Sequence, residues 1–127
     1  MISLQRLIQL QLVYYLLGMV FNFVSMYMIG QGEQQLTPND PYFGCLSMTI
    51  YAFFLLPGLK QKVTTYRILM LIAVVLLGYG GVYRHIDMYQ STPELYCCTA
   101  AAIIGPGINV FGLVLNLIAV SGLFRQE

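Results

Sequence analysis

Four long apolar runs constrain what this chain can fold into more than any other feature of its sequence. We place them at approximately residues 7–29, 41–59, 66–89 and 95–124. An α-helix rises about 1.5 Å per residue, so about 20 apolar residues cross a hydrocarbon core about 30 Å thick. The 127 residues are 58% hydrophobic and only 9% charged, whereas a water-soluble domain needs a far more charged surface. The sequence therefore predicts an all-α integral membrane protein, a single four-transmembrane-helix bundle in contact with the lipid bilayer.

The connection between the first two runs carries the usual signals for helix ends. Residues 30–40 hold two glycines, one proline and two acids, a composition typical of a loop. Asn39 or Asp40 can cap the second helix, and Pro41 suits its first turn. We therefore expect a short loop here, followed by a well-defined helix start.

The fourth run is too long for one straight crossing. It contains Gly105-Pro106-Gly107, where proline removes a backbone donor and the glycines let the chain bend. We expect the fourth helix to be kinked or broken there. Residues 95–104 then either lie over the bundle as a short outer piece or belong to a single bent helix that crosses with a tilt. The alanines at 100–102 favour the second arrangement.

The basic residues predict the orientation of the bundle. Of the six lysines and arginines, Arg84 alone falls on one side of a four-helix topology, and the positive-inside rule makes the opposite side cytoplasmic. That side carries Arg6, Lys60, Lys62, Arg67 and Arg125. Both termini are then cytoplasmic, and the compact form suits a bacterial inner membrane. A net charge of +1 offers no basic face, so no nucleic-acid partner is expected.

Small and polar residues recur at helical spacing in the first and fourth runs. Steps of four and three place Gln11, Tyr15, Gly18, Asn22 and Ser25 on one face, and likewise Gly105, Asn109, Gly112, Asn116 and Ala119. The candidate intramembrane polar and packing face comprises Gly18, Asn22, Asn109, Gly112 and Asn116. It either lines a polar pathway or ligand cavity, or holds the helices together by hydrogen bonds and close packing. The absence of charged residues at this depth in the sequence favours the second interpretation.

The densest group of ionisable and aromatic residues follows the third run. This candidate outer-face cluster consists of Tyr83, Arg84, His85, Asp87 and Glu94. Such residues suit anion, headgroup or proton chemistry. They also suit a plain helix end, because Arg84 and Asp87 can pair locally and tyrosines form an ordinary interfacial belt. One histidine lacks the further ligands of a metal site, and no nucleophile stands at motif spacing from a base. We therefore predict no metal, no cofactor, no catalytic residue and no enzyme activity.

The three cysteines are Cys45 and the adjacent pair Cys97 and Cys98. They do not form a Cys-x-x-Cys motif, so the usual spacing of a thiol oxidoreductase or zinc site is absent. All three fall near the outer ends of the second and fourth helices. A disulfide from Cys45 to Cys97 or Cys98 and a set of buried free thiols both remain open.

One stretch of about thirty residues has a family resemblance. Gly80-Gly81, then Arg84, then Pro93 at the start of the last helix resembles the third-helix end of small bacterial four-helix membrane proteins of the DoxX-like group. The resemblance implies a four-helix topology and little about activity, because most members of that group are uncharacterised. The Gly105-Pro106-Gly107 interruption and the long fourth run depart from the pattern.

Short loops and glycine-rich helix faces predict a non-catalytic accessory or assembly subunit that packs against other membrane protein subunits. The alternative is a small carrier or binding protein that holds an apolar or lipid-like molecule beneath the outer loops. A buried cavity beside Arg84 and Asn109 would favour the carrier, and a tightly packed interior would favour the subunit. Self-association and the identity of the partner or ligand stay open.

Overall fold

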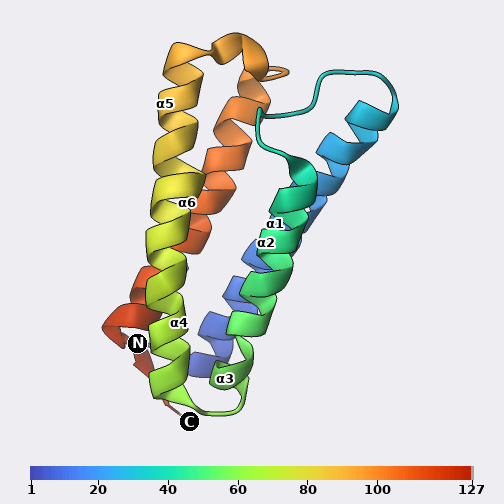
Figure 1. The fold of residues 1–127 in the computed structure, drawn as a ribbon. Coiled ribbons are helices and arrows are strands. Elements are labelled where there is room, and N and C mark those ends of the chain that lie inside the picture. The colour runs from blue at the N-terminus through green and yellow to red at the C-terminus, as the bar shows by residue number, and fades with distance from the viewer. Residues whose placement is uncertain (127) are drawn as a thin grey trace.

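The computed structural model describes residues 1–126, and helices make up most of it (Figure 1). The helices are α1 (Leu4–Gly30), α2 (Pro41–Phe54), α3 (Leu56–Leu59), α4 (Val63–Leu76), a π-helix (Leu77–Tyr83), α5 (Arg84–Ser91), a 3₁₀ turn (Pro93–Leu95) and α6 (Thr99–Ser121). Within the described residues, four helical stretches are long and apolar enough to cross a membrane: Leu4–Gly30, Pro41–Leu59, Val63–Ser91 and Thr99–Ser121. The predicted all-α four-helix membrane bundle is confirmed.

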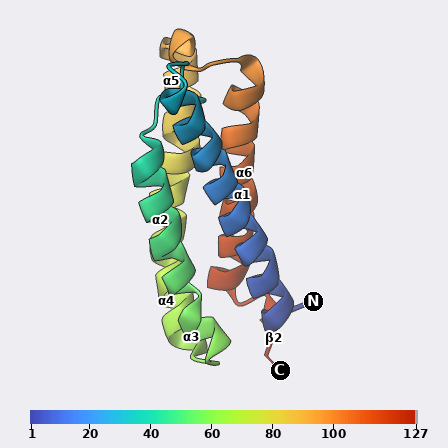
Figure 2. The same ribbon diagram turned by 90° about the vertical axis from the view of Figure 1, so that its right-hand side faces the viewer.

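The four spans run up and down with short connections (Figures 1 and 2). α1 packs against both α2 and α6, and α4 packs against α6. Both termini lie at one end of the bundle, which we call the terminal end (Figure 1). We call the opposite end, which carries residues 31–40 and α5, the loop end.

A feature that the sequence did not predict joins the two termini. β1 (Ile2–Ser3) pairs in parallel with β2 (Phe124–Arg125), with Ile2 opposite Phe124 and Ser3 opposite Arg125. α6 ends earlier than the predicted boundary because Gly122 adopts a left-handed conformation with φ of 74°, which glycine tolerates. The chain can then turn back toward the start of α1.

The fourth span is one continuous helix, so the break considered at Gly105-Pro106-Gly107 does not occur. Pro106 lies inside α6. A Cβ atom at Gly105 would lie 3.1 Å from Phe21 Cζ, so the missing side chain lets α6 pack closely against α1 beside the proline. α6 begins at Thr99, later than the predicted residue 95, because Cys98 has an extended backbone with φ −166° and ψ 164°.

The third span contains a π-helix that the sequence analysis did not predict. It covers Leu77–Tyr83, and the Asn109 side chain of α6 donates its Nδ2 to Gly81 O at 2.8 Å. A Cβ at Gly81 would lie 3.0 Å from Asn109 Nδ2. Gly81 therefore allows the two spans to approach closely where the backbone departs from the α-helical pattern, a departure often seen at functional positions.

The helix starts follow local chemistry where the sequence supplies it. At α2, Tyr42 N donates to Asp40 Oδ1 at 2.9 Å and Pro41 occupies the first turn, as the sequence indicates. α4 has no side-chain cap and begins at Val63 rather than residue 66.

The main apolar core contains residues from all four spans. It includes Leu4, Leu7, Ile8, Tyr14, Leu55, Tyr66, Met70, Leu115 and Ala119.

Candidate functional site

A chain of buried hydrogen bonds joins all four spans. Gln11 of α1 donates its Nε2 to Asn116 Oδ1 of α6 at 3.1 Å, and it accepts from the Tyr66 hydroxyl of α4 at 2.6 Å. The Tyr51 hydroxyl of α2 donates to the same Asn116 Oδ1 at 2.7 Å. Gln11 and Asn116 are both 0% exposed. We call Gln11, Tyr51, Tyr66 and Asn116 the four-span network.

Apolar and aromatic groups enclose the four-span network. The second Nε2 hydrogen of Gln11 points to Met70 Sδ at 3.2 Å, and the Tyr14 ring packs edge-on against Tyr51 with centroids 5.1 Å apart. Tyr14 also covers Gly112, where a Cβ would lie 2.5 Å from the ring. These contacts enclose Gln11 and Asn116, both 0% exposed, among apolar and aromatic side chains.

One polar atom of the network has no partner. Asn116 Nδ2 is buried and makes no hydrogen bond within residues 1–126. A buried donor left unpaired costs about 1–3 kcal/mol, although Asn116 Oδ1 accepts two hydrogen bonds. The network is built from neutral amides and phenols, which suits holding helices together and provides no charged group for an ion or proton route.

A second buried group lies at the loop end. His85 Nε2 faces Asn39 Nδ2 at 2.7 Å, and His85 Nδ1 faces the Tyr96 hydroxyl at 3.0 Å. The Tyr96 hydroxyl donates to the His85 backbone oxygen at 3.2 Å. Since an amide nitrogen can only donate, we assign His85 as the neutral Nδ1–H tautomer, which accepts at Nε2 and donates to Tyr96. We call Asn39, His85 and Tyr96 the loop-end cluster.

The segment of residues 31–40 is pinned across the loop end rather than being a plain loop. Leu36 N donates to Ser25 Oγ of α1 at 3.0 Å, and Cys97 N donates to Leu36 O at 3.2 Å. Thr37 is buried. The segment therefore ties the end of α1 to the connection before α6. Burial at this end raises the pKa of the Tyr96 hydroxyl.

The five residues of the predicted outer-face cluster do not converge. Of these five, all of which are described, His85 alone is buried, and its side chain bonds to Asn39 and Tyr96. Tyr83 is 61% exposed and stacks on Tyr79 with centroids 5.9 Å apart. Arg84, Asp87 and Glu94 are exposed. Any function of this group stays a prediction.

The predicted intramembrane face is divided among different helix contacts. On α1, Gly18 lies against Met48 of α2, whose Sδ would be 2.6 Å from an added Cβ. Asn22 donates its Nδ2 to its own helix at Gly18 O, 2.8 Å away. It also packs on Gly44 of α2, where an added Cβ would meet the Asn22 side chain. Both residues serve the contact between α1 and α2.

On α6 the remaining members of that face have two separate roles. Asn109 bonds to the π-helix at Gly81, whereas Asn116 belongs to the four-span network and Gly112 receives the Tyr14 ring. These side chains do not line one common pathway in the structure. A ligand cavity or polar pathway lined by these residues stays a prediction.

The sequence did not predict which residues bond to one another in the four-span network or in the loop-end cluster. In the sequence, Tyr66 and Met70 belong to an apolar run, and Asn39 is one of two candidate caps of the second helix, with Asp40. A glutamine and a tyrosine inside otherwise apolar runs are the available signal for the four-span network, since a buried polar side chain needs a partner. No comparable signal connects Asn39 with His85, 46 positions away.

The three cysteines do not form a disulfide bond in the structure. Cys45, Cys97 and Cys98 are free, so the structure contains no bridge from Cys45 to the pair. Two hollows of about 280 and 230 Å³ lie near the terminal end, not beside Arg84 and Asn109. They are lined by Thr64, Arg67, Ile68, Leu71 and Val120, and by Leu4, Gln5, Ile8, Gly58, Leu59 and Gln61. Across the described residues, no group of three His, Cys, Asp or Glu is placed to hold a metal ion.

Comparisons with protein-family models, curated proteins and solved structures found no match to this chain. The resemblance to the DoxX-like group therefore stays a prediction about topology.

Proposed function

We propose that this chain is a non-catalytic accessory or assembly subunit that packs laterally against other membrane proteins through α2. The observation that carries the proposal is the set of exposed aromatic and large apolar residues on α2. This fully described helix of 14 residues buries only Pro41 and Tyr51. Its exposed side carries Tyr42, Phe43, Leu46, Ile50 and Phe53, which are 47–67% exposed.

The exposed side of α2 combines aromatic residues with a row of small ones. Cys45, Thr49 and Ala52 follow one another at steps of four and three, and Thr49 is exposed. The Thr49 hydroxyl donates to Cys45 O at 2.9 Å, so it needs no external partner. Small residues let a neighbouring helix approach closely in a membrane, and aromatic residues are enriched at protein interfaces. This combination supports a helical protein partner on α2.

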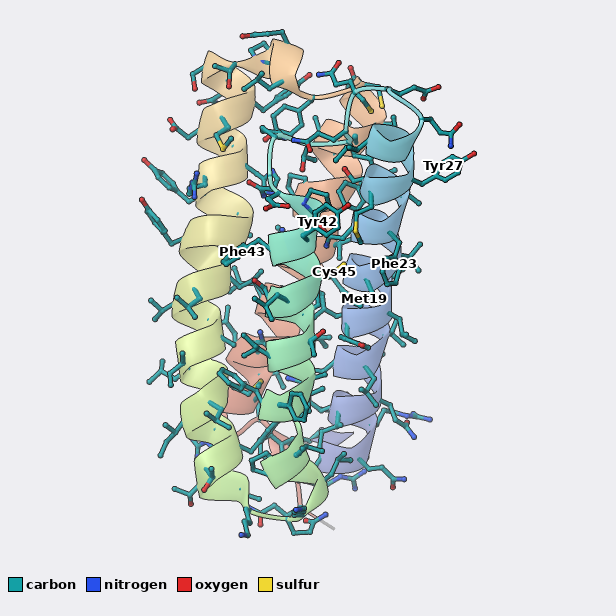
Figure 3. The ribbon with its side chains drawn as sticks, turned by 45° about the vertical axis from the view of Figure 1, so that its right-hand side comes forward. Met19, Phe23, Tyr27, Tyr42, Phe43 and Cys45 are labelled. Atoms are coloured by element: carbon teal, nitrogen blue, oxygen red, sulfur yellow. The ribbon has the colours of Figure 1, made fainter. Side chains whose placement is uncertain are left out.

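The aromatic surface continues from α2 onto α1. Figure 3 shows Tyr42 of α2 and Phe23 of α1 on the same side of the molecule, whereas Phe43 lies on the side of α2 away from α1 and Tyr27 points outward from α1. Phe23 and Tyr27 are 54% and 68% exposed. A partner seated on α2 can therefore extend its contact along the loop-end half of α1.

The interior offers less support for a carrier. A carrier site beneath the outer loops would need space beside Asn109, whose side chain is instead bonded to Gly81 O of the π-helix. The four-span network closes the bundle by direct side-chain contacts. The enclosed four-span network and the exposed aromatic residues of α2 favour the subunit.

We further propose that both termini are cytoplasmic and that the membrane is a bacterial inner membrane. Both termini lie at one end (Figure 1), together with Arg6, Lys60, Lys62, Arg67 and Arg125, whereas Arg84 begins α5 at the other end. The positive-inside rule assigns the more basic end to the cytoplasm. Reporter fusions at the two termini test this orientation.

Photocrosslinking in native membranes tests the lateral interface. A photoreactive amino acid is placed at Thr49 or Tyr42 of the full chain, and the matched control carries it at Val75, which is exposed on α4 at 62%. We expect discrete protein adducts from both α2 positions and lipid adducts alone from Val75. Lipid adducts alone at all three positions would contradict the proposal. The mass of the adduct separates another subunit from a second copy of this chain.

Mild-detergent purification gives an independent measurement. We expect the crosslinked partner to copurify with the unmodified chain. Recovery of a lone monomer from the same membranes would count against an accessory subunit.

A further inference from the structure

Cys97 and Cys98 form a close pair of thiols at the loop end. Their Sγ atoms are 3.0 Å apart. Cys98 is exposed and occupies the N-cap position of α6, where its side chain makes no capping hydrogen bond. The bond from Cys97 N to Leu36 O at 3.2 Å fixes the backbone of the pair against residues 31–40. The two sulfurs are therefore held together at a position that solvent reaches.

The geometry places the two sulfurs close to bonding distance. A disulfide has a sulfur–sulfur distance of about 2.05 Å, so closing the pair requires a movement of about 1 Å. Consecutive Cα atoms lie about 3.8 Å apart, less than the usual separation across a disulfide of about 4.4–6.8 Å. Strained disulfides are readily reduced. A bond formed here would be reversible rather than a permanent staple.

The two thiols are chemically unequal. Burial, followed by the interaction with Cys98, raises the pKa of Cys97 to about 11. The hydrogen bond from Cys97 lowers the pKa of Cys98, and the nearby backbone amides of Ala101 and Ala100 act in the same direction. Free amides at the start of a long helix favour a negative charge. Cys98 is thus the more acidic thiol of the pair and the readier to form a thiolate.

We propose that Cys97 and Cys98 form a thiol–disulfide exchange site for low-molecular-weight disulfides, with Cys98 as the attacking thiolate and Cys97 as the resolving thiol. With oxidised glutathione, Cys98 Sγ bonds to one glutathione sulfur and the other leaves as a thiolate. Cys97 then gives its proton to the first glutathione thiolate or to solvent and attacks Cys98 Sγ, which breaks the mixed disulfide and releases the second glutathione as a thiolate. The cysteines lose two electrons, and one glutathione disulfide is reduced to two thiols. This site uses no residue of the α2 surface and is independent of the proposed subunit role.

Intact-mass analysis of the reduced full-length protein in detergent tests the proposal, with oxidised glutathione as the probe and Cys45→Ser as the background. We expect the two-cysteine protein to lose two hydrogens without accumulating an adduct. Cys97→Ser should stop at one glutathione on Cys98. Cys98→Ser should react at least about tenfold more slowly, because the remaining thiol is largely protonated. Serine is a good N-cap residue, so α6 should keep its start in that variant, and circular dichroism checks this.

Two outcomes would overturn the exchange site. A stable glutathione adduct on the two-cysteine protein, equal to that on Cys97→Ser, would show that Cys97 does not resolve it. Equal rates for the two serine variants would show that Cys98 is not the attacking group. Phenylarsine oxide provides a second measurement, because it bridges two adjacent thiols with release of water. We expect one bridged arsenic in the two-cysteine protein and none in either variant, and absence of bridging in the folded two-cysteine protein would also contradict the pairing.

Discussion

The four-span network and the loop-end cluster are both buried polar groups, but they connect different parts of the chain. The network joins side chains 55 to 105 positions apart, each from a different span. The loop-end cluster joins His85 to Asn39, 46 positions away, and to Tyr96, 11 positions away. Near the terminal end the spans bind one another directly. At the loop end, connecting segments bind the spans.

The difference in burial follows the same division. Within the fully described α5, His85 is the one buried residue, whereas α1 buries Leu4, Leu7, Ile8, Gln11 and Tyr14 along its first turns. Regions with few buried contacts open locally at a lower free energy than the core does. We therefore expect the network to govern global unfolding and the loop-end cluster to govern local opening.

Replacing the shared acceptor of the network should have the largest effect. Asn116→Ala removes the acceptor of both Gln11 and Tyr51, and it also removes the unpaired Nδ2. We expect the free energy of unfolding in detergent to fall by about 2–4 kcal/mol, from two membrane hydrogen bonds and the donors left unpaired. Reversible denaturation with SDS measures the change.

Asn22→Ala is the matched control for Asn116→Ala. Its amide bonds to Gly18 O of the same helix, so its loss should lower the free energy of unfolding by less than about 1 kcal/mol. Equal losses in the two variants would mean that hydrogen bonds between spans contribute no more than those within a helix. The distinction between the network and the rest of the polar face would then disappear.

Adding one methyl group beside the network should have the next largest effect. In Gly112→Ala the new Cβ would lie 2.5 Å from the Tyr14 ring, which is 1% exposed and held by Tyr51. Overpacking of this kind lowers the free energy of unfolding by about 1–3 kcal/mol. Gly107→Ala on the same helix meets nothing within 4 Å and should be neutral or stabilising. Similar SDS denaturation curves for the two variants would contradict close packing at Gly112.

The same division explains what the sequence could predict. Run length and composition sufficed for the number of spans, since a membrane imposes both. The steps of four and three also placed Gln11, Gly18, Gly112 and Asn116 on faces that the structure buries. Spacing within a helix says which residues share a face. It does not say which positions along two packed helices lie at the same level. The pairing of Gln11 with Asn116 therefore could not be predicted from the sequence.

The loop end was harder to predict for a physical reason. Composition identified residues 31–40 as a connection, but their contacts with Ser25 and Cys97 depend on how the finished spans are spaced. The π-helix at Leu77–Tyr83 likewise bonds to Asn109 of another span. The short parallel pairing of the termini forms only because α1 begins beside the end of α6. Each of these features requires the assembled bundle.

A substitution at the loop-end cluster should change local opening more than global stability. His85→Phe keeps an aromatic ring but removes the bonds to Asn39 and Tyr96. We expect faster hydrogen exchange in residues 31–40 and 92–98, with the free energy of unfolding reduced by less than about 1 kcal/mol. Tyr66→Phe is the control, because it removes one network bond and should leave exchange at the loop end unchanged. A large global loss in His85→Phe would place both groups in one cooperative unit.

The smallest expected effect is a change in the reactivity of Cys98, with no change expected in the free energy of unfolding. The hydrogen bond from Cys97 is the main cause that lowers the pKa of Cys98, and only the thiolate is readily alkylated. In a Cys45→Ser background, Cys97→Ala should therefore shift the alkylation rate profile of Cys98 to higher pH, so that its rate at neutral pH falls. Cys97→Ser keeps a hydrogen-bond donor and should shift the profile less. Iodoacetamide labelling across pH, followed by peptide mass analysis, measures both profiles. If the Cys97→Ala variant and the protein that retains Cys97 gave the same profile, Cys97 would not stabilise the Cys98 thiolate. The loop end would then differ from the four-span network in its packing alone and not in its chemical reactivity.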